Sequence, residues 1–540
     1  MTPADYATPK WWKEAVVYQV YPASFKSSKP ANQADGWSDV RGITEKVPYL
    51  KCLGVDVVWT SPVYKSPQVD MGYDISDYKA IDPRYGTMAD VDCLIETLSK
   101  HDMKLMMDLV VTHTSNQHDW FIESSRSKDS PAWTWSETTQ EFYLTLHTPE
   151  QVDLNWENPD VVAAVHDVMH FWLSQGDPSL PDAPVVVPNC EYQPGERFYT
   201  NGPRFHEFMH EIYDNVLSKY DTITVGETPY VSDISEIIKT VGATARELNM
   251  IFIFDHMELA DVKTKGTLNG QIFSGWQRKM IEWDGWNAVF LECHDQARSI
   301  SRYVDDSDQF RARGGKLLAL LQTTLGGTSY LYQGQEIGMR NFSADWDPEV
   351  DYRDVERINF WRKIKKLYSD DPVEMEKARD LLQKKARDHA RTPMQWSDEP
   401  NAGFAGPGVT PWMRVNDDLQ TVNMKTQMER DSQELSVWQY WQLAIRERKT
   451  YTDVFVYGDY KDVDIEKEKV YAYLRTGAQT KEKWLVVMNW TGEDVVWTLS
   501  NSVEVDSITS STLQRDISVE EGATIKLQAW EGVKILCKTA

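Results

Sequence analysis

The run NAVFLECHD, residues 287–295, begins apolar and ends in Cys293, His294 and Asp295. A continuous apolar run of this length is typical of a strand that is buried on both faces of a sheet. Reactive polar side chains at its end lie where such a strand leaves the sheet. The run therefore indicates one strand of a parallel sheet with candidate functional residues at its C-terminal end.

Six further runs have the same character, and helix-like stretches separate most of them. They are VVYQVYP (16–22), VDVVWTSP (55–62), KLMMDLVVTH (104–113), DTITVGE (221–227), LNMIFIFDH (248–256) and SYLYQGQE (329–336). This alternation predicts an α/β fold with a parallel sheet, and eight such units close a (β/α)8 TIM barrel. Barrels of this kind carry their chemistry at the C-terminal strand ends, where the chain has Asp108, His113, Glu227, His294 and Asp295.

The fourth strand of the barrel is missing from the pattern. A helix is predicted over 159–175, and the next helix begins near Pro203. The only apolar run between them is Val185–Val187, which Pro184 and Pro188 flank. Because proline cannot donate to a sheet ladder, this segment makes a poor central strand. We therefore expect a barrel that is incomplete at strand 4.

Three domains are predicted. Residues 1–113 and 158–458 form the barrel, and residues 114–157 form a shortened, loop-rich insertion after the third strand, because a loop of that length in a compact barrel is usually functional or a small domain. From residue 459 to residue 540 the pattern changes to short runs such as KVYAYLR and KWLVVMNW. These runs predict a C-terminal antiparallel β domain.

Composition excludes several classes of partner. The 540 residues include 57 Lys and Arg against 83 Asp and Glu, a net charge of −26. Such a chain repels phosphate backbones and anionic lipids, so we expect neither a nucleic acid nor a membrane partner. The first twenty residues lack the pattern of a signal peptide, and no run reaches membrane-spanning length. Five scattered cysteines without metal spacing favour a reducing, cytoplasmic compartment, and we expect a monomer there.

The strand-end residues suggest acid–base chemistry. Glu227 follows TVG at the end of an apolar run, where partial desolvation would raise the pKa of its carboxyl group as a general acid requires. Taken alone, a carboxylate at such a position is more often structural than catalytic. The pairs Asp108–His113 and His294–Asp295 are equally weak signals when taken singly. Their convergence at one end of a barrel indicates a site for a neutral polar ligand.

The chain resembles the α-amylase superfamily of glycoside hydrolases, and within it the oligo-1,6-glucosidase or maltase/isomaltase branch. The resemblance spans the chain almost end to end, in the family's order. The matching segments are WWKEAVVYQVYPASF, GYDISDY (72–78), DLVVTHTS (108–115), QVDLNWENP (151–159), TVGE (224–227), HDQARS (294–299), LYQGQEIGMRN (331–341) and RTPMQW (391–396).

The resemblance implies roles for individual residues. Glu227 would be the acid/base, and Asp295 would be the transition-state stabiliser that grips two sugar hydroxyl groups. Five further residues match those that hold the terminal glucose, namely Tyr73, Asp74, His113, His294 and Arg391. We expect Asp74 and Arg391 to form an ion pair at the floor of the pocket.

The sequence departs from the family at the nucleophile. The fourth strand normally carries Gly-Phe-Arg-x-Asp, whose Asp is the nucleophile, whereas here Gly176 runs directly into Asp177. Asp177 and Asp182 are the nearest acids, and neither follows a strand that could aim it. The segment 127–143 is also shorter than the loop that the relatives carry at this place. A retaining mechanism needs two carboxyl groups, so we expect little or no hydrolytic activity from this chain.

Smaller departures concern a metal loop and two motif positions. The family's calcium pattern Asp-x-Asn-x-Asp-Gly-x-x-Asp keeps only Asp35, Gly36 and Asp39, while Ala31 and Gln33 replace oxygen ligands. Calcium binding needs several hard oxygens, so we expect no cofactor and no confident metal site. In the barrel motifs, two positions that usually hold Asn are here Thr112 and Cys293.

The resulting interpretation is an α-glucosidase-like protein that releases glucose, with retention, from the non-reducing end of short α-glucosides of the maltose or isomaltose type. Its expected partner is a small α-glucoside or glucose. Two alternatives stay open at this point. The first is a catalytically silent sugar-binding or assembly protein, and the second is a sucrose isomerase or transglycosylase. The preference for α-1,4 or α-1,6 linkages depends on the residue after the nucleophile, which this chain lacks.

Overall fold

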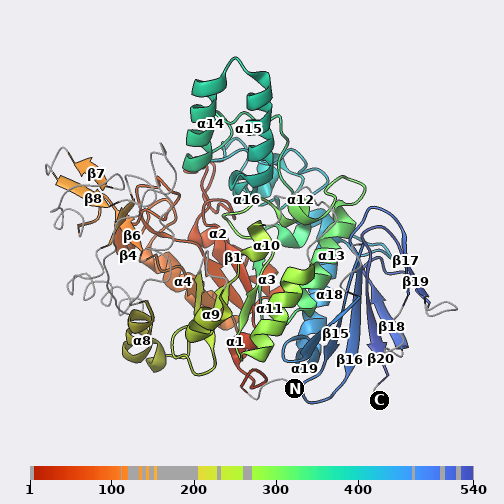
Figure 1. The fold of residues 1–540 in the computed structure, drawn as a ribbon. Helices are drawn as coiled ribbons and strands as arrows, with labels where there is room; N and C mark the ends of the chain where they lie inside the picture. Colours follow the sequence, from red (N-terminus) through yellow and green to blue (C-terminus); the bar gives the residue numbers. More distant parts are fainter. Residues whose placement is uncertain are drawn as a thin grey trace. The chain divides into compact units, whose positions relative to one another are not determined.

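The seven apolar runs each form a strand of the parallel sheet (Figure 1). The strands are β1 (Val16–Val20), β2 (Val57–Thr60), β5 (Lys104–Met107), β10 (Val225–Glu227), β11 (Met250–Phe252), β12 (Asn287–Val289) and β13 (Thr328–Tyr332). β13 is parallel to both β1 and β12, and β10 is parallel to β11. Every residue of β1 and β13 is buried, as expected for strands covered on both faces. The predicted parallel α/β core is confirmed.

The computed structural model describes residues 5–110, 112–119, 133–136, 141–144, 151–154, 205–227, 233–258, 270–464, 469–498, 505–518 and 524–538. The predicted helix at 159–175 and the predicted gap at strand 4 lie outside these residues. The chain divides into two units. The first comprises Met1–Trp59, Leu94–Leu105 and Phe254–Ala540, and the second comprises Thr60–Cys93 and Met106–Ile253.

The first unit contains most of the helices that the structure describes. They are α1 (Trp11–Glu14), α2 (Val40–Glu45), α3 (Val47–Leu53), α10 (Asp255–Glu258), α11 (Gly270–Glu282), α12 (Ser299–Tyr303), α13 (Arg311–Thr324), α14 (Val355–Tyr368), α15 (Pro372–Lys385), α16 (Asp388–Arg391), α17 (Met424–Met428), α18 (Val437–Thr450) and α19 (Thr452–Phe455), with 3-10 turns at Gln335–Ile337 and Pro400–Gly403. α18 begins at a capping box made by Ser436 and Gln439, which satisfies N–H groups of its first turn. It packs on α13, most of whose residues are buried.

The helices α14 and α15 form an antiparallel hairpin (Figure 1). Each begins at an aspartate cap, Asp354 for α14 and Asp371 for α15, and Pro372 occupies the first turn of α15. Trp361 of α14 and Leu382 of α15 are buried in one apolar cluster. Burial of this shared face holds the hairpin together.

The second unit adds short antiparallel pairs to its parallel strands. They are β3 (Tyr64–Lys65) with β4 (Asp77–Ile81), β6 (His113–Ser115) with β9 (Gln151–Asp153), and β7 (Trp133–Ser136) with β8 (Glu141–Leu144). The helices of this unit are α8 (Phe205–Asn215) and α9 (Ile234–Val241), with a 3-10 turn at Leu217–Lys219, and α4 (Met88–Lys100) runs from the second unit into the first. Three of the pairs' strands, β7, β8 and β9, belong to the predicted insertion after the third barrel strand.

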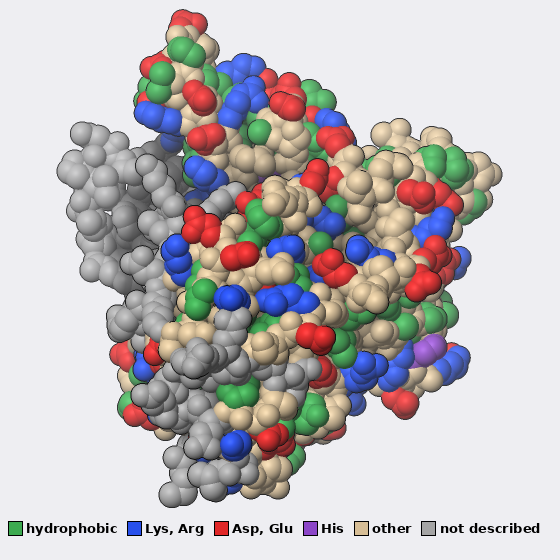
Figure 2. All heavy atoms as spheres, turned by 90° about the vertical axis from the view of Figure 1, so that its right-hand side faces the viewer, with side chains coloured by type: hydrophobic (Ala, Val, Ile, Leu, Met, Phe, Trp, Pro, Cys, Tyr) green, Lys and Arg blue, Asp and Glu red, His purple; other side chains and the backbone are tan. Residues whose placement is uncertain are grey.

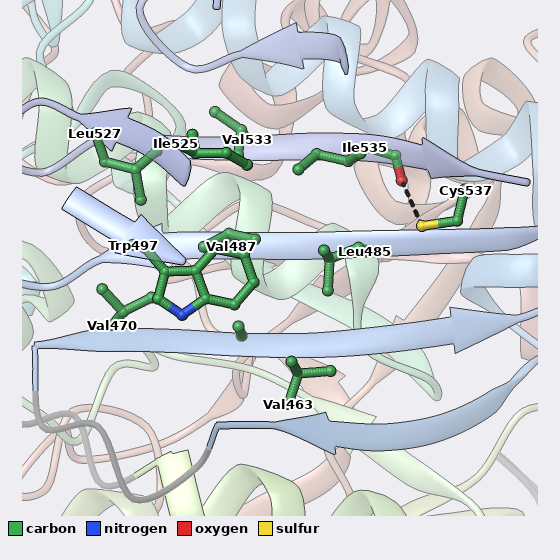
Figure 3. Close-up of a cluster of buried hydrophobic side chains, with 11 residues drawn as sticks. Val463, Val470, Leu485, Val487, Trp497, Ile525, Leu527, Val533, Ile535 and Cys537 are labelled. Carbon is green, nitrogen blue, oxygen red and sulfur yellow. Dashed lines mark hydrogen bonds between the residues drawn. The ribbon is translucent and has the colours of Figure 1, made fainter. Parts of the chain in front are cut away.

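The C-terminal part of the first unit is antiparallel, as predicted. Five strands follow the order β14 (Asp459–Val463), β15 (Val470–Thr476), β16 (Lys483–Asn489), β20 (Gly532–Cys537) and β18 (Val505–Ser511), and β17 (Val495–Thr498) pairs with β19 (Thr524–Leu527). Figure 3 shows apolar side chains from both sheets gathered in one core, including Leu485, Val487 and Trp497. Alternate residues face this core, which is the period-two pattern of a strand. The predicted domain boundaries stay a prediction.

The described surface carries both signs of charge. On the face that Figure 2 shows, Asp and Glu side chains are interspersed with Lys and Arg. Within the described ranges, no helix has the length and apolar character that crossing a bilayer requires.

Candidate functional site

His294 and Asp295 lie beyond the C-terminal end of β12, on a segment that leaves the sheet after Val289. His294 is buried, whereas the Asp295 side chain is 32% exposed. His294 Nε2 lies 3.2 Å from Asp295 Oδ2. The pair therefore presents a carboxylate to solvent at the strand end where barrel proteins carry out chemistry.

Arg391 connects this pair to other segments of the first unit. Its side chain is buried at the end of α16. Nη2 donates to Asp295 Oδ1 over 2.9 Å, and Nε donates to the His294 carbonyl oxygen over 3.1 Å. Nη1 donates to Asp354 Oδ2 over 3.2 Å. Because the guanidinium group is planar, three contacts on two segments fix its orientation. The structure thus brings together three of the predicted site residues.

Charge around Asp295 favours its ionised form. Burial by itself would raise the pKa of Asp295, but the guanidinium groups of Arg387 and Arg391 hold this pKa well below its ordinary value. Arg387 Nη1 lies 3.5 Å from Asp295 Oδ1. An ionised carboxylate only accepts hydrogen bonds, so Asp295 can accept them from neighbouring hydroxyl groups of a ligand.

Gln19 selects the tautomer of His294. Burial lowers the pKa of His294 to about 4, so the imidazole is neutral near pH 7 and has a single N–H. Gln19 Nε2, which can only donate, lies 2.9 Å from Nδ1, so Nδ1 accepts and the N–H lies on Nε2, the atom that faces the Asp295 carboxylate. The sequence reasoning missed Gln19, although a lone amide inside the apolar run 16–22 was a usable signal.

Tyr73, Asp108 and His113 form a second group, in the second unit. The Tyr73 hydroxyl donates to Asp108 Oδ2 over 2.9 Å, and His113 Nε2 lies 3.0 Å from the Tyr73 carbonyl oxygen. His113 Nδ1 lies 2.9 Å from Thr112 Oγ1. Thr112 therefore contacts the histidine at the motif position where Asn is usual.

The placement of His113 corrects one expectation. The sequence suggested that it ends the third barrel strand, whereas β5 ends at Met107 and His113 begins β6. β6 pairs with β9 in antiparallel register, and Gln151 of β9 places Nε2 3.1 Å from His113 Nε2. Apolar character continued past the end of the strand, so periodicity alone could not separate the two strands.

Asp74 is buried and bound by its own loop. Its oxygens accept hydrogen bonds from Ser66 Oγ and from the backbone N–H groups of Val69 and Asp70. Burial raises its pKa even though these hydrogen bonds oppose the shift. The expected ion pair with Arg391 joins residues of different units and stays a prediction.

Glu227 is the last residue of β10, opposite Phe252 in the register with β11. Its side chain is exposed, so the partial desolvation expected from the sequence is not observed. Its predicted role as acid/base stays a prediction. Asp177 and Asp182, the acids nearest to the expected nucleophile position, lie outside the described residues.

The residues of the degraded calcium loop do not fit a calcium ion. Both Asp35 oxygens accept from Lys29 Nζ at 2.8 Å, and Asp35 also accepts from the Trp37 N–H. The Asp39 carboxylate caps α2 through the Gly42 N–H and accepts from Ser28. Calcium needs six to eight oxygen ligands, and here the chain's own donors occupy both carboxylates. Among the residues that the structure covers, no cluster of His, Cys, Asp or Glu could hold a metal.

The parallel strands and the strand-end carboxylate place the chain among barrel proteins with an antiparallel C-terminal domain. A family model described as "Alpha amylase, catalytic domain" matches residues 19–458, and the chain belongs to this family. Its catalytic domain is a (β/α)8 barrel, so the fold predicted from the sequence is confirmed.

Individual relatives are similar over most of their length. The chain is 41% identical to an alpha-glucosidase of Schizosaccharomyces pombe, covering 92% of this chain and 93% of that protein. It is 41% identical to an oligo-1,6-glucosidase of Parageobacillus thermoglucosidasius, covering 96% and 98%. An isomaltulose synthase mutant of Erwinia rhapontici, solved with its natural substrate sucrose, is 33% identical with a TM-score of 0.88 and covers 99% and 100%.

The relatives contain segments that this chain lacks. The alignment with the oligo-1,6-glucosidase extends over 578 positions, whereas the chain has 540 residues. At least some of those positions therefore face gaps in this chain. This is the result expected if the chain has lost a strand and part of a loop.

Proposed function

We propose that the protein is an α-glucosidase-type glycoside hydrolase whose ligand is the glucose at the non-reducing end of a short α-glucoside. The observation that carries the proposal is the cluster of His294, Asp295 and Arg391 at the end of β12. It occurs in a chain that is 41% identical to an alpha-glucosidase and to an oligo-1,6-glucosidase. Hydrolysis is favoured over sucrose isomerisation because the isomaltulose synthase is the more distant relative, at 33% identity.

Asp295 would bind the sugar through its accepting oxygens. An ionised carboxylate can accept hydrogen bonds from two adjacent hydroxyl groups, and the bond that Arg391 Nη2 donates to Oδ1 holds the carboxylate in place. By their match to the family motifs, Tyr73, Asp74 and His113 would also be glucose-binding residues. Glu227 would protonate the leaving oxygen, and its exposure leaves the carboxyl accessible to such a group.

The covalent step of a retaining mechanism requires a second carboxylate. In that mechanism the nucleophile attacks the anomeric carbon, the acid protonates the departing oxygen, and water then releases the sugar from the glycosyl-enzyme. The sequence runs from Gly176 to Asp177 where Gly-Phe-Arg-x-Asp would stand. We infer that this chain binds its sugar but turns it over several orders of magnitude more slowly than an intact relative.

A catalytically silent sugar-binding protein is the second candidate function. It is favoured by one observation: the sequence lacks the nucleophile segment while the His294–Asp295–Arg391 cluster is in place. The two candidates share the ligand and differ only in turnover.

Calorimetry and a hydrolysis assay together test the proposal. Maltose and isomaltose should give binding heat with the folded chain, and Asp295→Ala should abolish it. Turnover of p-nitrophenyl α-glucoside that is low but sensitive to Glu227→Gln supports the hydrolase, whereas turnover indistinguishable from buffer supports the silent protein. Folded protein that gives no heat with either sugar would refute both.

The oligomeric state and the cellular compartment are further parts of the proposal. We infer a monomer in a reducing cytoplasm, acting on a small glucoside without a metal cofactor. Cys52 and Cys537 are free thiols, which fits a reducing compartment. Size-exclusion chromatography with light scattering would test the oligomeric state.

A further inference from the structure

Asp354 is a buried carboxylate that has no role in the proposed hydrolysis. It is 1% exposed and forms the N-cap of α14. Oδ1 accepts from the Arg357 backbone N–H over 3.0 Å, and Oδ2 accepts from Arg391 Nη1 over 3.2 Å. One oxygen therefore caps a helix while the other binds a residue of the candidate site.

Arg391 needs this second anchor because its other carboxylate partner is partly open. The Asp295 side chain is 32% exposed, and a sugar bound there would compete with Arg391 for the lone pairs of Asp295. Asp354 is closed to solvent, so its contact with Nη1 persists whether or not a ligand is present. Because the guanidinium group of Arg391 is planar, a fixed contact at Nη1 keeps Nη2 directed at Asp295.

Asp354 belongs to a cluster in which positive and negative side chains are equal in number. Arg387 Nη1 lies 3.8 Å from Asp354 Oδ2 and 3.5 Å from Asp295 Oδ1, so two guanidinium groups face two carboxylates. Asp388 accepts from the backbone N–H groups of Arg353 and Asp354, which fixes the backbone at the cap. Burial and the neighbouring Asp354 raise the pKa of Asp388 to about 6. Loss of Asp354 would leave Nη1 of the buried Arg391 without its carboxylate partner, which would lower the stability of the fold.

We propose that Asp354 is a positioning residue for the sugar site, holding Arg391 so that Nη2 stays on Asp295 Oδ1. The inference rests on the proposed function, because that function assigns Asp295 to the sugar. It makes the base of the α14–α15 hairpin part of the site's support. Figure 1 shows α16, which ends in Arg391, at the foot of that hairpin.

Three variants separate positioning from helix capping. Asp354→Ser retains a good N-cap but is too short to reach Arg391. Asp354→Asn retains the length of the side chain but has a single acceptor oxygen, so it can cap α14 or accept from Arg391 but cannot do both. Asp371→Ala removes the cap of α15 in the same hairpin, where the Asp371 carboxylate accepts from the Val373 and Glu374 N–H groups of the first turn of α15.

Maltose calorimetry on the folded full chain gives the decisive readout. Positioning predicts that Asp354→Ser weakens maltose binding by roughly tenfold or more and that Asp354→Asn also weakens it, because both variants lose the charge-assisted hydrogen bond to Arg391. Asp371→Ala should lower the melting temperature and leave the affinity within about twofold. An unchanged affinity in folded Asp354→Ser would overturn the proposal.

A second measurement does not depend on sugar binding. If the parent chain binds no maltose, the proposed function fails, and thermal melts of Asp354→Ser, Asp295→Asn and the double variant still test Asp354. Because both carboxylates hold Arg391, the double variant's shift in melting temperature should differ from the sum of the single shifts. Additive shifts would overturn the positioning role.

Discussion

Arg391 donates to Asp295 through Nη2 over 2.9 Å while its Nε holds the carbonyl oxygen of the residue before that aspartate. The guanidinium group thus grips both the side chain and the backbone of the segment after β12. A lysine at this position would keep the charge but carry its N–H donors on one nitrogen, which cannot span the three acceptors that Arg391 reaches.

Arg391→Lys should therefore weaken maltose binding by roughly 10- to 100-fold, since hydrogen bonds to charged groups contribute about 1.5–3 kcal/mol each. The melting temperature should also fall because Asp354 loses a buried partner. Arg414→Lys is the matched control, because Arg414 pairs with Asp417 at the surface. Calorimetry in which Arg391→Lys binds as tightly as the control would contradict this expectation.

Glu247 should make the stability of the second unit depend on pH. Its side chain is fully buried beside His206 Nδ1 (3.0 Å) and His210 Nδ1 (3.6 Å). Burial raises the pKa of Glu247 to about 8, although a hydrogen bond from Thr240 opposes the shift. Its folded-state pKa exceeds the unfolded value of about 4.3, so its contribution to stability is complete below that value and is lost as pH rises through about 8.

Glu247→Gln should remove this dependence. The difference in melting temperature between the variant and the parent should grow in favour of the variant from pH 5 to pH 9, because glutamine stays neutral throughout. Glu282→Gln, at an exposed position of α11, is the control and should follow the parent at each pH. A parent and a Glu247→Gln variant whose melting temperatures run parallel across this range would show that the buried carboxyl group does not titrate there.

Calcium should leave the thermal stability of the protein unchanged, because Lys29 and backbone donors already occupy the loop carboxylates. Melts with millimolar calcium and with a chelator should coincide. Lys29→Ala should cost about 0–1 kcal/mol, the usual value of a surface ion pair, and Lys377→Ala, which breaks the exposed pair with Glu374, is its control. A calcium-dependent rise of several degrees in the parent would mean that the loop rearranges to bind the ion.

Sequence patterns predicted the strands because a strand that is buried on both faces consists of a continuous run of apolar residues. They also located His294, Asp295 and Arg391 through their motifs, and these three residues do meet. The supporting contacts were out of reach, because Asp354 and Arg391 are separated by 37 positions and Gln19 and His294 by 275. No local pattern encodes such partners, since packing of distant segments decides them.

The last prediction concerns strand 4. Insertion of a strand and loop carrying Gly-Phe-Arg-x-Asp between Gly176 and Asp177 should raise stability and hydrolytic activity together. Stability should rise because a barrel that lacks one strand leaves backbone donors and acceptors unpaired. Activity should rise because a retaining mechanism would regain a carboxylate to face Glu227.

The same insertion with Asn in place of the nucleophile Asp separates the two effects. It should recover the melting temperature but not the turnover of p-nitrophenyl α-glucoside, because an amide cannot form the glycosyl-enzyme. If the Asp insertion stabilises the chain without restoring turnover, the shortened segment at 127–143 is a second lesion. If neither insertion stabilises the chain, the barrel closes without this strand and the predicted position of the gap is wrong.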